Sequence, residues 1–577
     1  MNVGLMMERQ RVPLAIAGAL AIVPLLTRDD YTLGVWTFIL LNVLVVVGLD
    51  LLLGYAGQLS LGHGAFVAVG AYVSALLTTK AGWSGWGAMP VGMLAAAVLA
   101  GVIAVPTLRL RGYYLAMATL GFPILFDAVI RVGSSWSGGS SGVTAIPGLM
   151  VKGVPLRDPA MYYWLVLGVV TIVLLLAWNI ANSRLGLKLR AIHADETAAL
   201  ARGIPVVRVK VMVFVLSAAI AALSGSLYVH NVQFVAAGTF GLQYSLMLVV
   251  MLVAGGMGRI WGGVAGVVVL GWLPELLRGF ATWQPVIFGS LLVAIMLFSP
   301  SGLAGLARRR TAFLPGKARS GMTAEAVPVH PQPLAGGDVL RVSDLRKRFG
   351  GVTALSGLNF AVQAGQIQSI IGPNGAGKST ALALISGALL SDAGTISING
   401  LPCAELTADR RALAGLGRTF QHARLIPTLT VFENIVLGAS SRAMPRLRSE
   451  ALATAVLDRL DLRDAAQRFP DEINHYQRRL TEIGIALALE PRVLLLDEPG
   501  AGLSASETDV LGQLLRELRS SGTAIVLVDH IMALVIPLSD RMLVLDGGVQ
   551  IADARPAEVL ADARVRTAYL GQGAEHA

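Results

Sequence analysis

The stretch Gly372-Pro-Asn-Gly-Ala-Gly-Lys-Ser-Thr380 decides the fold of the second half of this chain, because it has the spacing of a phosphate-binding loop. Glycines in such a loop let backbone N–H groups approach phosphate oxygens. Residues 366–371 predict a strand before the loop, and a helix is expected to begin near Ser379. Because a helix N-terminus favours an anion, this strand, loop and helix predict a nucleotide-binding α/β domain.

The composition indicates that much of the chain faces lipid. Its 577 residues are enough for two or more domains, and 54% of them are hydrophobic while 14% are charged. Soluble domains have about 25% charged residues. The long apolar runs lie in residues 1–300. We therefore predict an all-α polytopic membrane domain at 1–307, a flexible Pro-rich linker at 308–338 and an α/β P-loop ATPase domain at 339–577.

About ten apolar segments are long enough to be membrane helices. Arg9 and Arg11 precede the first one as in a signal peptide, but no small-residue cleavage site follows, so we expect an uncleaved helix. The segments are residues 13–26, 34–54, 61–79, 88–108, 113–131, 161–181, 211–235, 243–256, 261–279 and 284–300.

The distribution of positive charge predicts the topology of these helices. With the N-terminus inside and strict alternation, the outside loops hold only Arg28, Lys80, Lys152 and Arg157, and most other basic residues lie inside. Both termini and the ATPase domain are then cytosolic, in a multi-pass protein of the cytoplasmic membrane. The net charge of +10 follows this distribution and does not favour nucleic-acid binding. The inside residues are Arg9, Arg11, Arg109, Arg111, Arg184, Lys188, Arg190, Arg202, Arg208, Lys210, Arg259 and Arg308 to Arg310, and Arg131 and Arg278 lie at the edges of outside loops.

Two further features restrict the possibilities. The single cysteine, Cys403, excludes an intrachain disulfide and a cysteine-rich metal site. In the long inside loop 182–210, residues 189–200 are helix-prone and only partly apolar. We expect this helix to dock on the ATPase domain, with a helix lying on the membrane surface as the alternative.

Side chains downstream of the loop predict its chemistry. Lys378 is expected to reach the β- and γ-phosphates, and the Ser379 hydroxyl to bind Mg²⁺. Asp497 and Glu498 end the apolar run 493–496, where the aspartate can hold Mg²⁺ and the glutamate can deprotonate the attacking water. His530 follows another apolar run, and in this context we expect it to contact the γ-phosphate.

Several ionisable or polar residues lie in or beside the apolar segments. Such groups mark a transport path when they are truly intramembrane, but at helix ends they are simply hydrated. Both interpretations remain open for each of them. The residues are Asp50, Gln58, His63, Asp127, His230 and Glu275.

The C-terminal half resembles an ABC-transporter ATPase over its whole length. Residues 372–380 match its Walker A motif, Gln421 the Q-loop, 493–498 Walker B, 501–504 the D-loop and His530 the switch histidine. This resemblance implies that ATP and Mg²⁺ are bound and that Phe349 stacks on adenine. It implies as catalytic residues Glu498, His530 and Gln421, as nucleotide-binding residues Phe349, Gly372, Asn374, Gly375, Gly377, Lys378, Ser379 and Thr380, and as Mg²⁺ ligands Ser379, Asp497 and Gln421.

Both halves resemble the branched-chain amino-acid importer family. In the ATPase half, residues 417–427 and 566–571 are similar to that family. In the membrane half, residues 54–63, 106–115, 189–196 and 255–258 are similar to its permease, and residues 196–205 are similar to the coupling loop of importer permeases. The chain is therefore interpreted as a fusion of the permease with the ATP-binding subunit.

One motif departs from the family pattern. The signature close to L-S-x-G-Q is represented by Ile473-Asn-His-Tyr-Gln477, in which Asn474 replaces serine and Tyr476 replaces glycine. In the family, these signature residues meet the γ-phosphate of ATP held by the opposite ATPase. Tyrosine cannot offer the close backbone approach of glycine. We therefore expect a heterodimer with an ATPase that has an intact signature.

The resemblance implies ATP-driven import of branched-chain or related amino acids. Its implied partners are a second permease, a second ATPase and an extracytoplasmic substrate-binding protein, with membrane lipid around the helices and no nucleic acid. Urea or short amides are alternative substrates of the same broad family. An ABC exporter and a membrane ATPase that regulates without carrying cargo are alternatives from other classes.

Overall fold

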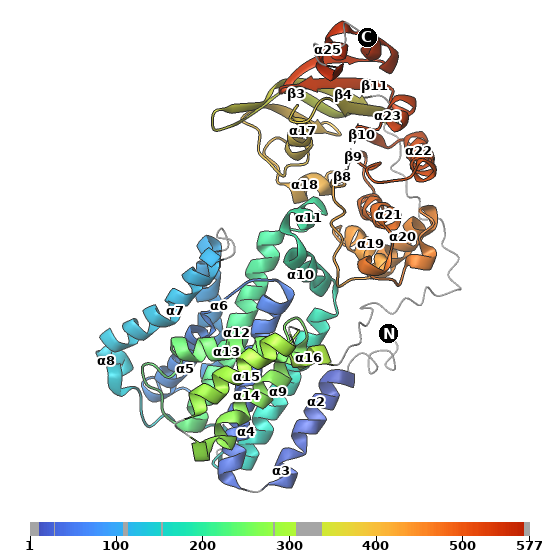
Figure 1. The fold of residues 1–577 in the computed structure, drawn as a ribbon. Helices are drawn as coiled ribbons and strands as arrows, with labels where there is room; N and C mark the ends of the chain where they lie inside the picture. Colours follow the sequence, from blue (N-terminus) through green and yellow to red (C-terminus); the bar gives the residue numbers. More distant parts are fainter. Residues whose placement is uncertain are drawn as a thin grey trace. The chain divides into compact units, whose positions relative to one another are not determined.

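The computed structural model describes residues 11–27, 29–107, 113–151, 154–280, 283–299, 301–306, 337–442 and 444–570. The chain forms two compact units. The first consists of Met1–His193 and Val207–Arg310, and the second of Ala194–Val206 and Thr311–Ala577 (Figure 1). Almost all of the predicted linker lies outside the described residues, so its boundaries stay a prediction.

The first unit is helical, as the apolar segments predicted. A two-stranded antiparallel ribbon, β1 (Met150–Val151) with β2 (Val154–Pro155), interrupts the helices. The helices are α2 (Arg11–Ala21), α3 (Val23–Leu26), α4 (Asp30–Leu49) with its π-helical extension η1 (Asp50–Tyr55), α5 (His63–Thr79), α6 (Gly85–Thr107), α7 (Tyr113–Val132), α8 (Ser134–Ser137), α9 (Pro159–Ala181), α10 (Arg184–Ala194), α12 (Val206–Val232), α13 (Leu242–Gly255), α14 (Ile260–Leu276), α15 (Gln284–Phe298) and α16 (Leu303–Leu306).

Four helices among the described residues are long and apolar enough to cross a membrane: Asp30–Tyr55, Gly85–Thr107, Pro159–Ala181 and Val206–Val232. The number rises to six if two bent pairs, Ala116–Val132 with Ser134–Ser141 and Leu242–Gly255 with Ile260–Leu276, each count as one span. Val12–Leu26 and His63–Thr79 are shorter apolar helices. The predicted helical membrane domain is confirmed, with four to six candidate spans among segments that the sequence alone numbers at about ten.

Burial separates helices of the unit's interior from those at its surface. The α4 span is almost wholly buried, whereas most of α6 is not. On α6, Leu94, Val98, Val102 and Val105 are each more than half exposed and recur at helical spacing, which makes an apolar stripe suited to lipid. Inside the unit, a Cβ on Gly225 would lie 1.9 Å from the Val67 carbonyl oxygen, so this glycine lets α12 approach α5 closely.

The second unit is an α/β domain with two sheets. The larger sheet has the strand order β12-β11-β5-β10-β9-β8, in which only the edge strand β12 is antiparallel to its neighbour. The smaller sheet is antiparallel with the order β4-β3-β6-β7. The strands are β3 (Asp338–Phe349), β4 (Val352–Gln363), β5 (Ile367–Ile371), β6 (Ala393–Ile398), β7 (Leu401–Pro402), β8 (Leu416–Arg418), β9 (Val493–Asp497), β10 (Ala524–Val528), β11 (Arg541–Asp546) and β12 (Val549–Ala554).

Helices complete the second unit. The segment Ala194–Val206 contributes α11 to it (Figure 1). The helices are α11 (Glu196–Ala201), α17 (Lys378–Ile385), α18 (Ala408–Leu413), α19 (Val431–Ala439), α20 (Arg446–Arg459), α21 (His475–Leu487), α22 (Ala505–Ser520), α23 (Met532–Leu538), α24 (Pro556–Ala561) and α25 (Ala563–Leu570).

The parallel strands bring the predicted chemistry to one edge of the larger sheet. Strands β5, β9 and β10 are buried along their whole length, as their continuous apolar sequences predicted. Because parallel strands end on the same side, the segments that follow β5, β8, β9 and β10 meet at one edge. These segments carry the phosphate-binding loop, Gln421, Glu498 and His530 respectively.

Candidate functional site

The phosphate-binding loop joins β5 to α17, as predicted. Gly372 and Gly377 have φ of +152° and +101°, and a Cβ on either would lie within 2.6 Å of a backbone oxygen of a neighbouring strand. Gly375 also has positive φ, but a Cβ there would meet nothing within 4 Å. Two glycines are therefore required by the protein's own packing, while the exposed tip at Gly375 leaves room for a ligand beside its backbone.

Lys378 lies folded over this loop. Its Nζ donates to the carbonyl oxygens of Gly372 at 2.6 Å and Pro373 at 2.9 Å. Burial lowers the pKa of Lys378, although the nearby Glu498 and Asp497 act in the opposite direction. A phosphate oxygen can replace these carbonyl acceptors, so the loop and its lysine fit a triphosphate.

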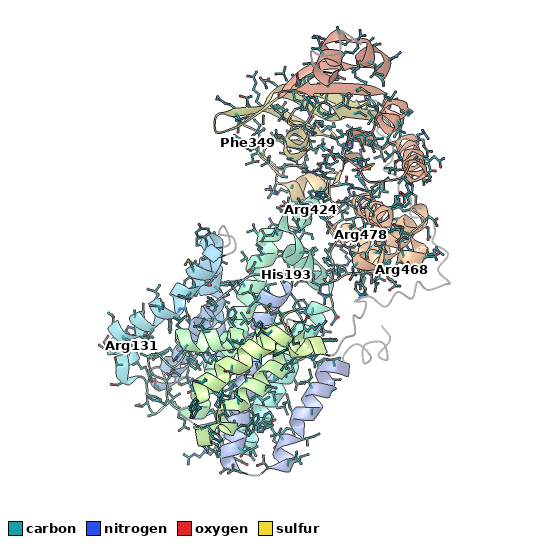
Figure 2. All side chains as sticks on the ribbon, in the orientation of Figure 1. Arg131, His193, Phe349, Arg424, Arg468 and Arg478 are labelled. Atoms are coloured by element: carbon teal, nitrogen blue, oxygen red, sulfur yellow. The ribbon has the colours of Figure 1, made fainter. Side chains whose placement is uncertain are left out.

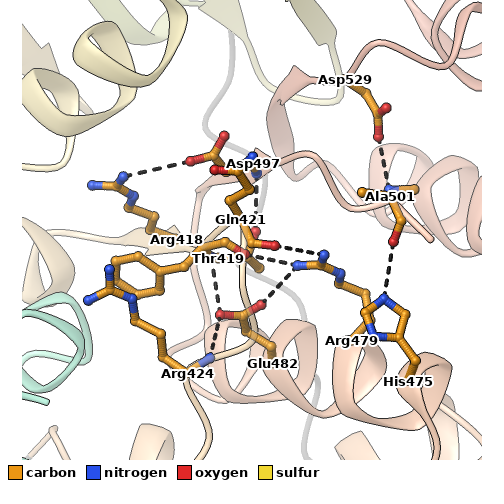
Figure 3. Close-up of polar contacts among 12 residues, drawn as sticks. Arg418, Thr419, Gln421, Arg424, His475, Arg479, Glu482, Asp497, Ala501 and Asp529 are labelled. Atoms are coloured by element: carbon orange, nitrogen blue, oxygen red, sulfur yellow. Dashed lines mark hydrogen bonds and ion pairs between the residues drawn. The ribbon is translucent and has the colours of Figure 1, made fainter. Parts of the chain in front are cut away.

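Asp497 ends β9 and is almost fully buried. Its backbone N–H donates to Thr419 Oγ1 at 3.2 Å, and its Oδ2 lies 3.9 Å from Arg418 Nη2 (Figure 3). Burial raises the pKa of Asp497, and Arg418 opposes that rise. No group of three or more His, Cys, Asp or Glu residues that could hold a metal exists in the described part of the chain. Mg²⁺ commonly needs only one or two protein ligands beside phosphate oxygens, so Asp497 and the Ser379 hydroxyl fit that ion.

The three predicted catalytic residues converge after β8, β9 and β10. Gln421 Nε2 donates to Glu498 Oε2 at 3.1 Å. His530 Nδ1 lies 4.0 Å from the same carboxylate oxygen, and the His530 ring is largely exposed. Glu498 has φ of +48°, a sparsely populated conformation for a residue with a side chain, and its N–H donates to the Val528 carbonyl at 2.7 Å.

Asp529 supports this group, a role that the sequence analysis did not predict. Its Oδ2 accepts from Gly500 N–H at 2.9 Å, and its Oδ1 accepts from the N–H groups of His530 at 2.7 Å and Ile531 at 3.0 Å. The carboxylate therefore ties the turn after β9 to the residue that follows β10. The sequence signal for this role was the position of Asp529 directly after a buried apolar strand.

Phe349 lies at the end of β3, opposite Val352 in the β3–β4 hairpin. Its ring is half exposed, with Lys347 Nζ 5.7 Å from the ring centroid (Figure 2). The hairpin reaches the phosphate-binding loop through β4, because Gly548 donates to Ala376 of the loop and accepts from Ser356 of β4. Stacking of Phe349 on adenine stays a prediction.

The altered signature begins α21. Asn474 is the N-cap of this helix: its Oδ1 accepts from Gln477 N–H at 2.8 Å, and the Gln477 side chain bonds back to the Asn474 N–H. Asparagine therefore preserves the capping function that serine has in such a box. His475 Nε2 lies 3.1 Å from the Ala501 carbonyl oxygen, which links the signature to the turn after β9 (Figure 3).

The segment around Gln421 is held from α21 by a buried ion pair, Arg479 with Glu482. Glu482 Oε1 accepts from the N–H groups of Phe420 at 3.1 Å and Arg424 at 3.3 Å. Arg479 donates to the carbonyl oxygens of Phe420 and Gln421, both at 2.9 Å (Figure 3). Burial raises the pKa of Glu482 to about 7, while Arg479 and the two backbone donors lower it.

The same segment is held from the other side by residues 194–206, which belong to the second unit. Asp195 Oδ2 accepts from Arg424 Nη1 at 2.6 Å, and Arg202, which is 5% exposed, donates to the Arg424 carbonyl. Ala198 and Ala201 of α11 pack on Phe420. The prediction that this loop docks on the ATPase is confirmed.

The docking helix is shorter than the sequence suggested. Residues 189–200 were expected to form one helix, but α10 ends at Ala194 and α11 begins at Glu196. Asp195 adopts an extended conformation, and its Oδ1 accepts from the Ala198 N–H at 2.9 Å. This aspartate is the N-cap of α11, and that role breaks the helix.

Most of the singled-out polar residues of the membrane half bond to different partners in the described part of the chain. Asp50 accepts from Gly258 N–H at 2.7 Å, His63 lies 2.7 Å from Ser217 Oγ and His230 lies 2.9 Å from Ser74 Oγ. Glu275 accepts from the Tyr31 hydroxyl at 2.7 Å. Gln58 is buried, with no side-chain hydrogen bond to any described residue. Asp127 pairs with Arg131.

Comparison with known families assigns both halves of the chain. Residues 31–300 match the permease component of the branched-chain amino acid transport system. Residues 355–501 match the ABC transporter family, and residues 550–575 match the branched-chain amino acid ATP-binding cassette transporters. The matches together cover a permease and an ATP-binding cassette in one chain.

Individual relatives match the ATPase half. The high-affinity branched-chain amino acid transport ATP-binding proteins BraF of Pseudomonas aeruginosa and LivG of Escherichia coli are each 35% identical over 250 residues, which is 41% of this chain and 98% of the relative. A solved ATP-binding cassette of an ABC transporter in its ADP conformation is 29% identical, with a TM-score of 0.38, and covers 41% of this chain and 100% of the solved chain.

Proposed function

The chain belongs to the branched-chain amino acid family of ABC transporters, as a fusion of the permease with the ATP-binding cassette, and from this premise we propose that it imports branched-chain amino acids. It is a multi-pass membrane protein whose ATPase domain couples ATP hydrolysis to transport. The observation that carries the proposal is the presence of both matches in one chain. The fused domain boundaries are proposed at 307 and 339.

The loop residues Gly372, Asn374, Gly375, Gly377, Lys378, Ser379 and Thr380 bind the phosphates of ATP, and Phe349 stacks on its adenine. Ser379, Asp497 and Gln421 hold Mg²⁺, which supplies neutralising charge at the phosphates. Both assignments are supported by the open loop tip and the buried carboxylate at its strand end.

Glu498 accepts a proton from the water that attacks the γ-phosphate. Its Oε2 is oriented by the hydrogen bond from Gln421, and His530 stands beside the same oxygen to contact the γ-phosphate. Lys378 offsets the negative charge of the phosphates. Arg479 of α21 also donates to the Gln421 carbonyl oxygen. A shift of α21 would therefore move the Gln421 backbone through the Arg479 side chain, and with it the hydrogen bond to Glu498.

Movement of the cassette reaches the permease through residues 194–206. This segment contacts the Gln421 segment through the ion pair of Asp195 with Arg424, the hydrogen bond from the buried Arg202, and the packing of α11 on Phe420. It also lies directly before the long helix α12. The ATPase and both termini lie in the cytosol, at the inner face of the cytoplasmic membrane. The proposed partners are a second permease, a second ATPase and an extracytoplasmic substrate-binding protein.

Reconstitution tests this function. The full chain is co-purified with its partner chains, placed in liposomes with ATP on the cassette side, and assayed for uptake of radiolabelled leucine. Import of leucine that is lost in Glu498→Gln supports the proposal. Uptake of urea or acetamide in place of leucine would identify the alternative substrates, transport toward the binding-protein side would identify an exporter, and ATPase activity without flux would identify a regulatory ATPase.

A further inference from the structure

A pocket in the first unit has two unpaired polar groups and lies away from the ATP site. It lies between α5, α7 and the segment after α12, and we call it the α5–α7 pocket. Its walls include Tyr72, Phe126, Asp127, Gly238 and Phe240. Tyr72 is 3% exposed, and its hydroxyl has no hydrogen-bond partner among the described residues. Leaving a buried hydroxyl unpaired is unfavourable, so the pocket is chemically incomplete.

Asp127 provides the second unpaired group. Its Oδ2 accepts from Arg131 Nε at 2.8 Å, whereas its buried Oδ1 bonds to no residue that the structure describes. An ionised carboxylate only accepts hydrogen bonds, and a phenol can accept as well as donate. A small cationic donor therefore complements both groups.

The size of the pocket admits an ammonium group. Its volume is about 10 Å³, which is room for one water-sized group, and it is partly open, so the rest of a bound molecule can extend outward. Phe126 and Phe240 line it, and a cation is attracted to an aromatic ring when it lies over the ring face. A bare metal ion is less suited, because it needs a larger set of oxygen ligands.

Arg131 lies next to Gly238 and Asp127 of the pocket and suits a carboxylate. Its side chain is about half exposed (Figure 2). At Gly238, which has φ of +85°, a Cβ would lie 3.5 Å from Arg131 Nη2 and 4.0 Å from Asp127 Oδ1. The missing side chain therefore leaves space next to both charged groups. Because Asp127 and Arg131 lie close together, they match a molecule that carries its ammonium and carboxylate groups on one carbon.

We propose that the α5–α7 pocket binds the ammonium and carboxylate groups of an α-amino acid as it enters the permease. This inference rests on the proposed function, whose topology puts the C-terminal ends of α5, α7 and α12 on the extracytoplasmic side. Tyr72 lies seven residues from the end of α5 and Asp127 five from the end of α7, so the pocket lies roughly 10 Å from these ends. A leucine released by a binding protein reaches it first.

Direct binding tests the pocket without transport. Purified full chain in detergent is titrated with radiolabelled leucine, and bound leucine is displaced with isopentylamine, which lacks the carboxylate, or isocaproate, which lacks the ammonium. We expect the amine to displace leucine better than the acid. Asp127→Asn should weaken leucine binding tenfold or more, and the isosteric Tyr72→Phe should weaken it several-fold. Asp158→Asn makes the same charge change at the exposed N-cap of α9 and should bind as wild type.

The outcomes separate this inference from the proposed function. Unchanged leucine binding in both pocket variants would show that the pocket holds only water, and binding that needs sodium would show a cation site; either result overturns the inference. Leucine uptake by the reconstituted wild-type complex is scored separately. Leucine uptake without leucine binding at this pocket would support the import function and overturn the proposed pocket. Leucine binding at the pocket without uptake would overturn the import function alone.

Discussion

At the scale of single residues, the proposed chemistry depends on one atom, Oε2 of Glu498. Its positive φ is held by the bond from its N–H to Val528, and this conformation aims Oε2 at Gln421 and His530. Such strained residues persist where the surrounding structure fixes them, which is common at functional sites. The sequence identified Glu498 by its place after an apolar strand, but not the conformation that orients it.

Replacing Glu498 with glutamine should retain ATP binding and remove steady-state hydrolysis. The amide keeps the size and can still bond to Gln421, but it cannot take a proton, and loss of a general base costs about 10²–10⁴-fold in rate. ATP binding is measured with a fluorescent nucleotide, and turnover by phosphate release. Glu558→Gln, an exposed change on α24, is the matched control. Normal turnover in Glu498→Gln would remove it from the role of base.

Glu482 should make stability depend on pH near neutrality. Its folded-state pKa of about 7 lies above the ordinary 4.5, so its contribution is fully present below pH 4.5 and is lost as pH rises through about 7. That difference corresponds to at most about 3 kcal/mol. The melting temperature of the purified full chain, minus that of Glu482→Gln, should therefore fall between pH 5 and 8. A difference that stays flat over this pH range would mean that Arg479 and the backbone donors hold Glu482 ionised throughout.

At the scale of elements, α11 and α21 hold the Gln421 segment from two sides. The contact between Asp195 and Arg424 is partly exposed, at 31% and 40% for the two side chains. Solvent screening limits such a pair to about 0.2–1 kcal/mol. Its effect should therefore appear in coupling more than in folding.

Asp195→Asn and Arg424→Gln should each reduce the stimulation of ATPase activity by transported substrate, and the double variant should lose no more than one single variant. Such non-additivity is expected when two residues act through one contact. Basal and stimulated ATPase rates of the reconstituted complex measure it. The pair Arg446 with Glu450 has similar exposure on α20, and its neutral variants serve as the control. Additive losses would place the two residues in separate roles.

Sequence reasoning predicted elements better than the contacts between them. The loop at Gly372 to Thr380, the buried strands and the docking segment all follow from local patterns. The break at Asp195 arises because the Asp195 side chain caps α11. The π-helical turn at Asp50 has a partner at Gly258, 208 residues away, and Glu482 meets Phe420 across 62 residues. Local periodicity carries no information on contacts at such separations.

The number of membrane crossings was also beyond local patterns. Apolar runs identify α4 and α6 equally well, although tertiary packing buries α4 and leaves most of α6 exposed. The bend of 118° between Leu242–Gly255 and Ile260–Leu276 turns two predicted helices into one broken pair. A Cβ on Gly255 would lie 2.1 Å from the Gly262 carbonyl oxygen, so this bend depends on a close approach that only the folded chain defines.

At the scale of the whole molecule, we expect the cassette to hold ATP but not to complete the site of a partner. ABC cassettes work as dimers within transporter complexes, and the altered signature at Asn474 and Tyr476 begins a well-formed helix. Because Asn474 still caps α21, we expect the alteration to leave folding intact. We expect its consequence to fall on the opposite site of the dimer, where a tyrosine replaces the glycine that approaches the nucleotide in the family.

The purified full chain should therefore hydrolyse ATP slowly at every concentration, and a partner ATPase with an intact signature should raise its rate by tenfold or more. Asn474→Ser with Tyr476→Gly should give the chain alone a rate that increases with concentration, because two copies then complete each other. Serine caps a helix as well as asparagine does, so the melting temperature should change little. Fast turnover by the wild-type chain alone would show that Ile473 to Gln477 works as it stands and that two copies of this chain form a competent pair. No gain in the double variant would show that the altered signature is not what slows the chain.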